Sequence, residues 1–255
     1  MPSLDIFQYP YNSDNYGILL HSRETGETAA IDAGDANALQ AALKDNGWSL
    51  SHIFITHHHA DHTAGLETAK KNSNCKVTGP GLSSQIPGLD KTVVHGDTFQ
   101  FAGVEIQVIH TPGHTRDMMN FYLPSENAVF TGDTLFALGC GRLFEGDAEM
   151  MWNSLELLKK LPPETTVYCS HEYTEANASF AITIDPENED LISRIESIRE
   201  KRANNQPTVP SKLSEELRTN PFLRADAPEI RAQLNMQHAS DVEVFAEIRA
   251  RKDNF

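Results

Sequence analysis

Short apolar runs, separated by turn residues, fill the first two thirds of the chain. Runs of this length that are apolar throughout, or that alternate apolar with polar residues, predict β-strands. Residues 104–109 (VEIQVI) alternate most regularly. The other segments expected to form strands are residues 18–20, 29–31, 53–55, 93–94, 99–101, 121–123, 128–130 and 166–168.

Helical spacing of apolar residues appears between some of these runs. Residues 36–46 predict a helix that ends at Gly47, because glycine is a frequent residue just beyond a helix C-terminus. Residues 150–161 predict a second helix, which Pro162 and Pro163 end because proline cannot continue a helix.

A change of pattern after about residue 173 indicates two domains. Strand patterns stop there, and apolar residues recur at helical spacing instead. Mixed strands and helices followed by helices alone are typical of a layered sheet-and-helix domain with an appended helical unit. We therefore expect domains at residues 1–173 and 174–255, while the pattern leaves the strand order open. The helices expected in the second domain include residues 191–198, 213–217, 228–234 and 242–248.

Composition excludes several classes of protein. With 39% hydrophobic and 22% charged residues, the 255-residue chain has ordinary globular usage and room for one large or two modest domains. No apolar run approaches the ~20 residues that cross a bilayer, which excludes a membrane-spanning helix. A formal net charge of −15 would repel phosphate backbones, so we expect no nucleic-acid partner.

Cysteine usage and the chain start indicate a reducing compartment. The first residues lack the basic and apolar regions of a secretory signal, and the three cysteines form no C-x-x-C pair. We therefore expect a cytoplasmic protein, in which the acceptor-like triplet at residues 177–179 (NAS) has no role in glycosylation. Cys140, between two glycines, is interpreted as a small buried thiol rather than a nucleophile.

Histidines gather in one run, residues 56–62 (THHHADH), directly after an expected strand. Imidazole and carboxylate are the ligands that zinc and similar cations prefer. Four ligands this close in sequence fit two adjacent ions better than one tetrahedral ion. His58 projects opposite to its neighbours and is not expected to bind metal. The candidate ligands in the run are His57, His59, Asp61 and His62.

Three further candidates follow expected strands later in the chain: His114, Asp133 and His171. Each alone is more often a turn or core residue, but beside the histidine run each becomes a candidate ligand. Seven ligands can be divided into two sets of three with one shared carboxylate. That division is how a bridged binuclear metal centre is built, so the sequence predicts such a centre.

These motifs, TPGHT at residues 111–115, TGDTLF at 131–136 and SHEYT at 170–174 among them, resemble those of the metallo-β-lactamase superfamily. More narrowly, residues 139–146 (GCGRLFEG) and the basic end at 249–255 resemble the hydroxyacylglutathione hydrolases, the glyoxalase II family. The resemblance extends over nearly the whole chain, including residues 14–16 and 220–222.

The resemblance implies an α+β fold, a four-layer αββα sandwich followed by a small all-helical domain. It implies one metal on His57, His59 and His114, a second on Asp61, His62 and His171, and Asp133 bridging both. The two divalent ions are expected to be zinc, with iron or manganese as alternatives, since all three accept such ligands. The resemblance also implies that a metal-bridging hydroxide is the nucleophile, so no residue beyond the ligands is expected to be catalytic.

The implied reaction is hydrolysis of S-2-hydroxyacylglutathione thioesters, as in S-D-lactoylglutathione to D-lactate and glutathione during methylglyoxal detoxification, by a monomeric enzyme. The departing thiol, of pKa about 8.5, leaves without a strong general acid. Basic side chains would offset the carboxylates of glutathione in this acidic chain. The residues implied to line the glutathione site are Arg142, Phe144, Tyr173, Arg249 and Lys252.

Two positions depart from the family pattern. Asp117-Met118 stands where many relatives have Gly-His, and Phe144 stands where some have Tyr. Three alternatives also remain at this point: a mono-iron glutathione persulfide dioxygenase on the same fold, a nucleic-acid phosphodiesterase, and a non-catalytic metal-stabilised module. The helical tail and SHEYT motif favour the hydrolase over the dioxygenase, and the net charge disfavours the phosphodiesterase.

Overall fold

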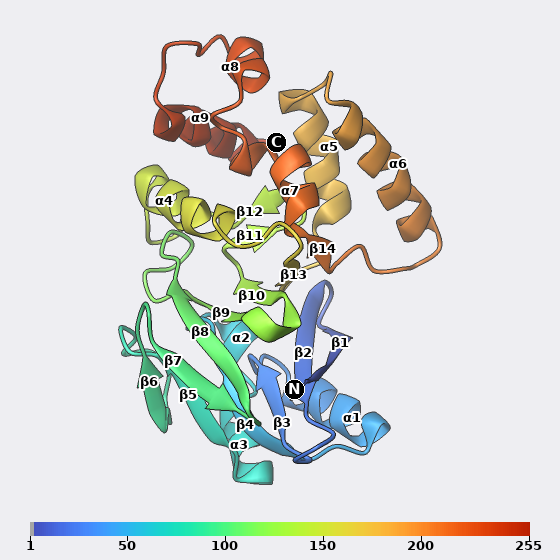
Figure 1. The fold of residues 1–255 in the computed structure, drawn as a ribbon, viewed down its shortest axis with the longest axis vertical. Coiled ribbons are helices and arrows are strands. Elements are labelled where there is room, and N and C mark those ends of the chain that lie inside the picture. The colour runs from blue at the N-terminus through green and yellow to red at the C-terminus, as the bar shows by residue number, and fades with distance from the viewer. Residues whose placement is uncertain (1–2) are drawn as a thin grey trace. The chain divides into compact units, whose positions relative to one another are not determined.

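The computed structural model describes residues 3–255, and these fall into two compact units (Figure 1). Of the described residues, unit 1 comprises 3–110 and 117–132, and unit 2 comprises Thr111–Arg116 and Asp133–Phe255. Each unit is therefore built from two separate stretches of the chain: residues 111–116 belong to unit 2, and the chain then returns to unit 1 for residues 117–132. The predicted domain boundary at residue 173 stays a prediction.

A six-stranded sheet with strand order β1-β2-β3-β4-β5-β6 forms one layer of unit 1. Strands β1 to β3 pair antiparallel, whereas β3 to β6 pair parallel, so this sheet is mixed. Strands β1 and β5 escape the sequence prediction because prolines and polar residues interrupt their apolar pattern. The strands are β1 Asp5–Tyr11, β2 Asn15–His21, β3 Thr28–Ile31, β4 Leu50–Phe54, β5 Lys76–Pro80 and β6 Lys91–Val93.

Helices α1 (Ala36–Asn46) and α3 (Leu66–Ser73) pack on this sheet through a shared apolar core, and α2 (Ala60–Thr63) is a single short turn. The predicted helix at residues 36–46 is confirmed together with its end at Gly47, which has a φ of 69° in the left-handed region. Its N-terminus is fixed by Asp35, whose side chain accepts hydrogen bonds from two backbone N–H groups of the first turn.

A second sheet of unit 1 is an antiparallel meander in the order β10-β9-β8-β7. Phe54 of β4 meets Phe99 of β7 and Phe121 of β9, with ring centroids 5.2 and 5.8 Å apart, so the two sheets pack face to face. The expected strands in this region are confirmed. They are β7 Thr98–Phe101, β8 Val104–His110, β9 Met119–Leu123 and β10 Ala128–Gly132, with the 3₁₀ turn η1 Pro124–Glu126 between the last two.

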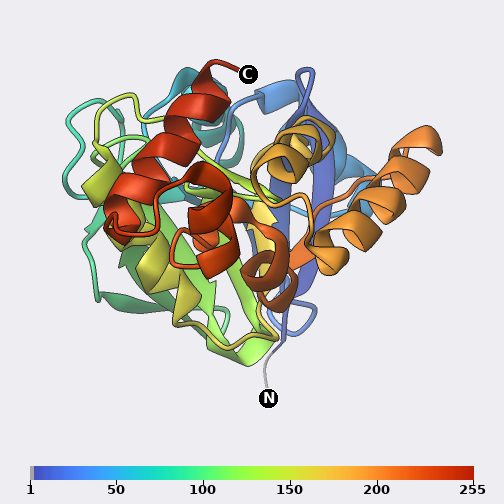
Figure 2. The same ribbon diagram turned by 90° about the horizontal axis from the view of Figure 1, so that it is seen from above.

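The helices of unit 2 make up most of it (Figure 2). Its described residues also include the short antiparallel pairs β11–β12 and β13–β14. After Tyr173 the only strand among the described residues is β14, of two residues, so the predicted helical tail is confirmed. The strands are β11 Leu135–Phe136, β12 Gly139–Cys140, β13 Thr166–Cys169 and β14 Ser211–Lys212. The helices are α4 Ala148–Lys159, α5 Thr174–Ile184, α6 Glu189–Ala203, α7 Leu213–Thr219, η2 Pro221–Leu223, α8 Pro228–Leu234 and α9 Asp241–Asp253.

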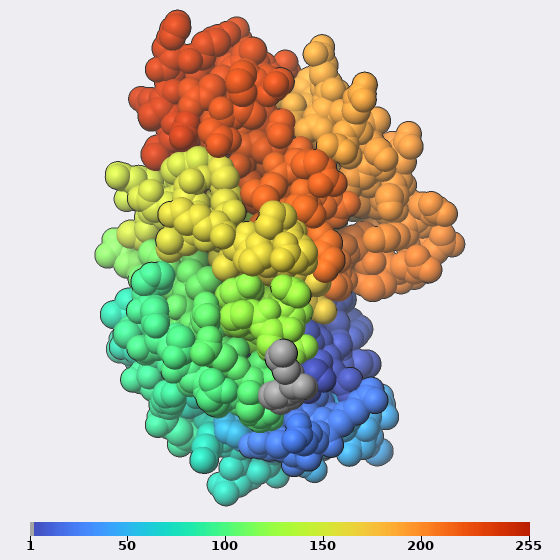
Figure 3. Space-filling model, in the orientation of Figure 1, coloured from blue at the N-terminus to red at the C-terminus, as the bar shows by residue number. Residues whose placement is uncertain are grey.

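Helix α4 begins two residues before its predicted start because Asp147 caps it, accepting a hydrogen bond from the N–H of Met150. Helix α6 packs against α5 through the predicted apolar stripe Leu191, Ile195 and Ile198. Most of the exposed side chains of α6 are polar, with Ile192 as an exception. The helix lies at the surface of unit 2 (Figure 3). Among residues 3–255, no helix combines the length and apolarity needed to span a membrane.

Candidate active site

The predicted ligands of unit 1 gather in the segment after β4, with His57 and His59 in the loop and Asp61 and His62 in the short helix α2. The side chains of His57 and His62 are completely buried, and their ring centroids lie 4.1 Å apart. The His59 ring lies 4.7 Å from that of His57, and the His62 Nε2 atom lies 3.5 Å from a carboxylate oxygen of Asp61. The loop therefore brings all four side chains to one place.

Asp32, at the end of β3, fixes this loop and was missed by the sequence analysis. Its carboxylate accepts hydrogen bonds from the N–H of Thr56 (2.7 Å), the hydroxyl of Thr56 (2.8 Å) and Nδ1–H of His62 (2.8 Å). The Thr56 oxygen in turn lies 3.0 Å from Nδ1 of His57. Histidines that bind metal commonly have their second ring nitrogen held in this way, which leaves Nε2 as the ligand atom. The sequence signal that could have identified Asp32 is its position as a polar residue directly after the expected strand at residues 29–31.

Asp61 is held by residues from the first two strands. The amide of Asn15 donates to its carboxylate at 3.1 Å, and the Tyr11 hydroxyl donates to its backbone carbonyl at 2.8 Å. The backbone of Gly34 approaches the same carbonyl so closely that a Cβ at Gly34 would lie 1.7 Å from the oxygen. Only glycine fits at that position, because any side chain would displace the loop.

The departure from the family pattern at residues 117–118 supplies a partner for His58. Nδ1 of His58 lies 3.0 Å from a carboxylate oxygen of Asp117, and both side chains are largely buried. Met118 is completely buried. Asp117 therefore gives the histidine next to two candidate ligands a fixed orientation, and the prediction that His58 binds no metal stays a prediction.

The predicted ligands of unit 2 converge on one carboxylate oxygen. Nε2 of His114 and Nε2 of His171 each lie 3.4 Å from Oδ2 of Asp133. All three residues are buried, although they come from segments far apart in the chain. Nδ1 of His114 is held by the backbone carbonyl of Arg142 at 2.9 Å, which again leaves Nε2 as the ligand atom.

Aromatic residues predicted to bind glutathione lie beside two of these ligands. The Phe144 ring packs against His114 with centroids 5.2 Å apart, and 63% of Phe144 is exposed. The Tyr173 ring stacks on His171 with centroids 4.6 Å apart, and 38% of Tyr173 is exposed. Both rings thus offer accessible apolar surface next to the candidate ligands of unit 2.

Positive charge gathers near the start of α5. The ammonium group of Lys252 donates to the Ala176 carbonyl at 3.2 Å. Partial burial, together with the charges of Arg249 and Arg142, lowers the pKa of Lys252. The three predicted cationic residues are therefore close enough to influence one another, which is an arrangement that attracts carboxylates.

Arg249 is buried, although a basic residue near the end of the chain would be expected to be exposed. Only 5% of it is exposed. Its guanidinium donates to the Cys140 carbonyl at 3.0 Å, pairs with Asp253 at 2.9 Å and lies over the Phe222 ring. Burial raises the pKa of the Cys140 thiol to about 11, so Cys140 is the inert buried thiol predicted from the sequence.

The donor set fits divalent metal ions. Each of the seven predicted ligands belongs to the His and Asp side chains that could hold a metal ion. Imidazole with carboxylate suits zinc, iron and manganese, and the imidazoles of His57, His62 and His114 already have Nδ1 engaged. The chemistry of these side chains therefore suits divalent ions, and their role as ligands stays a prediction.

Comparison with known proteins defines the class. Residues 18–171 match the family model of the metallo-beta-lactamase superfamily. The crystal structure of ETHE1 from Myxococcus xanthus aligns with a TM-score of 0.70 and 25% identity, covering 96% of this chain and 90% of that one. The molecule is thus a metallo-β-lactamase-fold metallohydrolase, in which two β-sheets are followed by a helical C-terminal region.

Residues 172–255 match the family model described as "Hydroxyacylglutathione hydrolase C-terminus". Hydroxyacylglutathione hydrolase of Rhizobium meliloti (strain 1021) is 52% identical over the full length of both chains. The Brucella anthropi enzyme of the same name is also 52% identical, over 100% of this chain and 98% of its own. The chain belongs to the hydroxyacylglutathione hydrolase family, glyoxalase II, which confirms the family, fold and hydrolase activity predicted from the sequence.

Proposed function

We propose that the chain hydrolyses S-2-hydroxyacylglutathione thioesters, S-D-lactoylglutathione among them, using two divalent metal ions. The observation that carries the proposal is the convergence of His114 and His171 on one oxygen of Asp133, each at 3.4 Å. A carboxylate facing two imidazole nitrogens at this distance suits a ligand shared between ions.

The assignment of ligands follows the family pattern, position by position. His57, His59 and His114 would hold one ion, Asp61, His62 and His171 the other, and Asp133 both. Bound divalent ions supply a water of lowered pKa and a Lewis acid for the thioester carbonyl. Zinc is our first choice, with iron or manganese as alternatives that the same ligands accept.

The residues around the ligands would orient them and prepare the imidazoles. Asp32 and the Arg142 carbonyl hold Nδ1 of His62 and His114, which fixes the rings and raises their basicity. No general acid is assigned, because a thiolate of pKa about 8.5 departs unaided near neutral pH. Cys140 takes no part because its thiol stays protonated.

Glutathione would be bound by the cations and rings of unit 2. Lys252 and Arg142 would face its carboxylates, with charge-assisted hydrogen bonds as the main attraction. The exposed rings of Tyr173 and Phe144 would pack against its aliphatic parts next to the ligands. Arg249 would act chiefly by holding this region together, through its bond to the Cys140 carbonyl.

We propose further that the enzyme acts as a monomer in the cytoplasm, in the detoxification of methylglyoxal, and that residues 1–173 and 174–255 are its two domains. Elution at the mass of one 28.3 kDa chain in light-scattering chromatography would support the monomer. A mass of twice that value at micromolar concentration would refute it.

The decisive experiment combines elemental analysis with assays on the purified protein. We expect two divalent ions per chain and hydrolysis of S-D-lactoylglutathione, which is measured through the free thiol that it releases. One iron per chain, with oxygen uptake on glutathione persulfide and no thioester hydrolysis, would instead establish the dioxygenase alternative. Full metal content without either activity would indicate a non-catalytic module.

A further inference from the structure

The hairpin β11–β12 links the candidate ligands of unit 2. Asp133 lies two residues before it, and Phe136 within it contacts the His171 and Tyr173 rings at centroid distances of 5.8 and 5.4 Å. Directly after the hairpin, the backbone of Gly141 is pressed so closely against His114 that an added Cβ would lie 2.9 Å from Nδ1. A shift of this hairpin would therefore move all three ligands.

The turn of this hairpin is buried and strained. Residues 136–139 are almost completely inaccessible, and Leu138 has a φ of 56°, in the left-handed region that non-glycine residues seldom adopt. A buried turn must find partners within the protein for its backbone groups, because water cannot reach them. Strain of this kind persists only where the surrounding structure enforces it.

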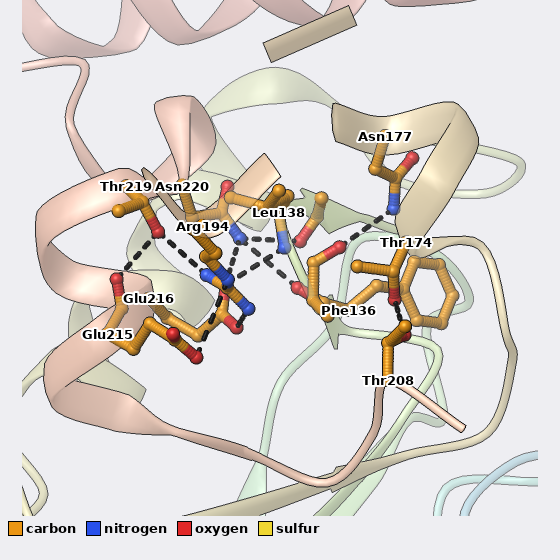
Figure 4. Close-up of polar contacts among 12 residues, drawn as sticks. Phe136, Leu138, Thr174, Asn177, Arg194, Thr208, Glu215, Glu216, Thr219 and Asn220 are labelled. Carbon is orange, nitrogen blue, oxygen red and sulfur yellow. Dashed lines mark hydrogen bonds and ion pairs between the residues drawn. The ribbon is translucent and has the colours of Figure 1, made fainter. Parts of the chain in front are cut away.

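Side chains from the helical region supply those partners (Figure 4). The Asn220 amide donates to the Phe136 carbonyl at 3.1 Å and to the Gly139 carbonyl at 3.0 Å. The N–H of Leu138 donates to the Glu216 carboxylate at 2.9 Å. Asn177 of α5 donates to the Ala137 carbonyl at 3.0 Å. Each of residues 136–139 thus has a backbone group bound by a side chain of α5, of α7 or of Asn220, which directly follows α7.

A buried ion pair holds the central carboxylate of this set. Glu216 is completely buried and pairs with Arg194 of α6 at 2.5 Å, while Arg194 also donates to the Thr219 hydroxyl at 2.7 Å. The Leu138 side chain is packed among apolar residues of α5 and α6. Because a buried charged group is costly unless it is fully satisfied, this network favours one position of the hairpin strongly over others.

We infer that Glu216 and Asn220 are positioning residues for the metal centre, acting on Asp133, His114 and His171 through the hairpin. The inference rests on the proposed function, since it assumes that these three residues bind metal. Under this inference the helical residues 174–255 would have two functions. They would bind substrate, and they would also set the geometry of three ligands that precede them in the chain.

The test compares Asn220→Ala and Glu216→Gln with the matched control Asn188→Ala. Asn188 caps α6 and bonds only within the helical region, so its loss weakens that region without touching the hairpin. Asn220→Ala leaves the Arg194–Glu216 pair in place, so the test does not depend on how well Glu216→Gln folds.

We expect zinc affinity, measured by chelator competition, to fall about 10- to 100-fold in both variants, the range seen when outer-shell support is lost. kcat should fall with KM changed less than about twofold, because the substrate groups remain. Amide exchange at residues 136–139 should accelerate in both. Asn188→Ala should keep zinc affinity and kcat while losing thermal stability.

Suppose that wild-type protein binds two ions and that folded Asn220→Ala keeps the wild-type zinc affinity and kcat. This result would overturn the positioning role but leave the proposed function standing. If the hairpin loosens but the affinity stays, the positioning role is equally refuted. If wild-type protein binds no metal, or Asp133→Ala binds two ions as well as wild type does, the proposed function itself fails. The two failures are therefore distinguishable.

Discussion

The two units assemble their candidate ligands in different ways. In unit 1, His57, His59, Asp61 and His62 come from one run of six residues, and neighbours such as Asp32 and Thr56 orient them directly. In unit 2, three ligands come from segments at positions 114, 133 and 171, and a buried hairpin lies beside all of them. One ligand set is local and the other depends on tertiary structure.

The difference shows what each set requires in order to form. The local loop needs one strand end, one glycine contact at Gly34 and one carboxylate at Asp32. The dispersed set needs the helical region to hold residues 136–139. We therefore expect loss of Glu216 or Asn220 to act on Asp133, His114 and His171, and loss of Asp32 to act on the loop.

Loss of a ligand from either set should have the largest effect. We expect His59→Ala and Asp133→Ala each to lower kcat/KM for S-D-lactoylglutathione by about 10³-fold or more, because metal-assisted hydrolysis requires the complete centre. Metal content per chain, measured by elemental analysis, should fall in parallel. Full activity in either variant would refute the ligand assignment for that unit.

Removing the support of the local set should have an intermediate effect. Asp32→Ala deprives His62 and Thr56 of their shared acceptor, so we expect metal affinity to drop about 10- to 100-fold. The control is Asp35→Ala, which removes the cap of α1 and costs about 1 kcal/mol of stability without touching the loop. Equal metal affinity in the two variants would contradict the role given to Asp32.

Substrate contacts in unit 2 should affect binding rather than turnover. Lys252→Ala is expected to raise KM about 10-fold with little change in kcat, as the loss of one charge-assisted hydrogen bond predicts. Arg251→Ala is the matched control, since Arg251 is exposed and pairs only with Glu247 among the contacts described for it. Identical KM values for the two variants would remove Lys252 from the glutathione site.

The smallest effect expected is a pH dependence of KM. Burial, with Arg249 and Arg142 nearby, lowers the pKa of Lys252, so its charge is present below that lowered pKa and is lost as pH rises through it. KM should therefore rise at a lower pH in the wild type than in Lys252→Arg, whose guanidinium stays charged. Superimposable KM–pH profiles would show that the charge of Lys252 does not contribute to binding.

The sequence predicted the local set better than its support. The run at residues 56–62 indicates a metal site because four candidate ligands, three histidines and one aspartate, occur together after a strand. Helix α1 and its end at Gly47 were also predicted to the residue, since propensity and capping agree there. His114, Asp133 and His171 became candidates only because the run at residues 56–62 supplies too few ligands for two metal ions.

The support of the dispersed set could not be predicted from pattern. Glu216 and Arg194 look like surface charges on amphipathic helices, and nothing local distinguishes Glu216 from its half-buried neighbour Glu215. Asn177 matched a glycosylation triplet, yet it is buried and bonded to the Ala137 carbonyl. Their roles depend on a turn some 40 to 80 positions away in the chain, which periodicity cannot detect.

The most direct test of the account is a metal titration of the chelated enzyme. Zinc is added to metal-free protein while bound metal and hydrolysis of S-D-lactoylglutathione are measured together. We predict no activity without metal and activity that reaches its maximum at two ions per chain. Full activity in the metal-free protein, or a maximum at one ion per chain, would contradict a binuclear centre built from these seven residues.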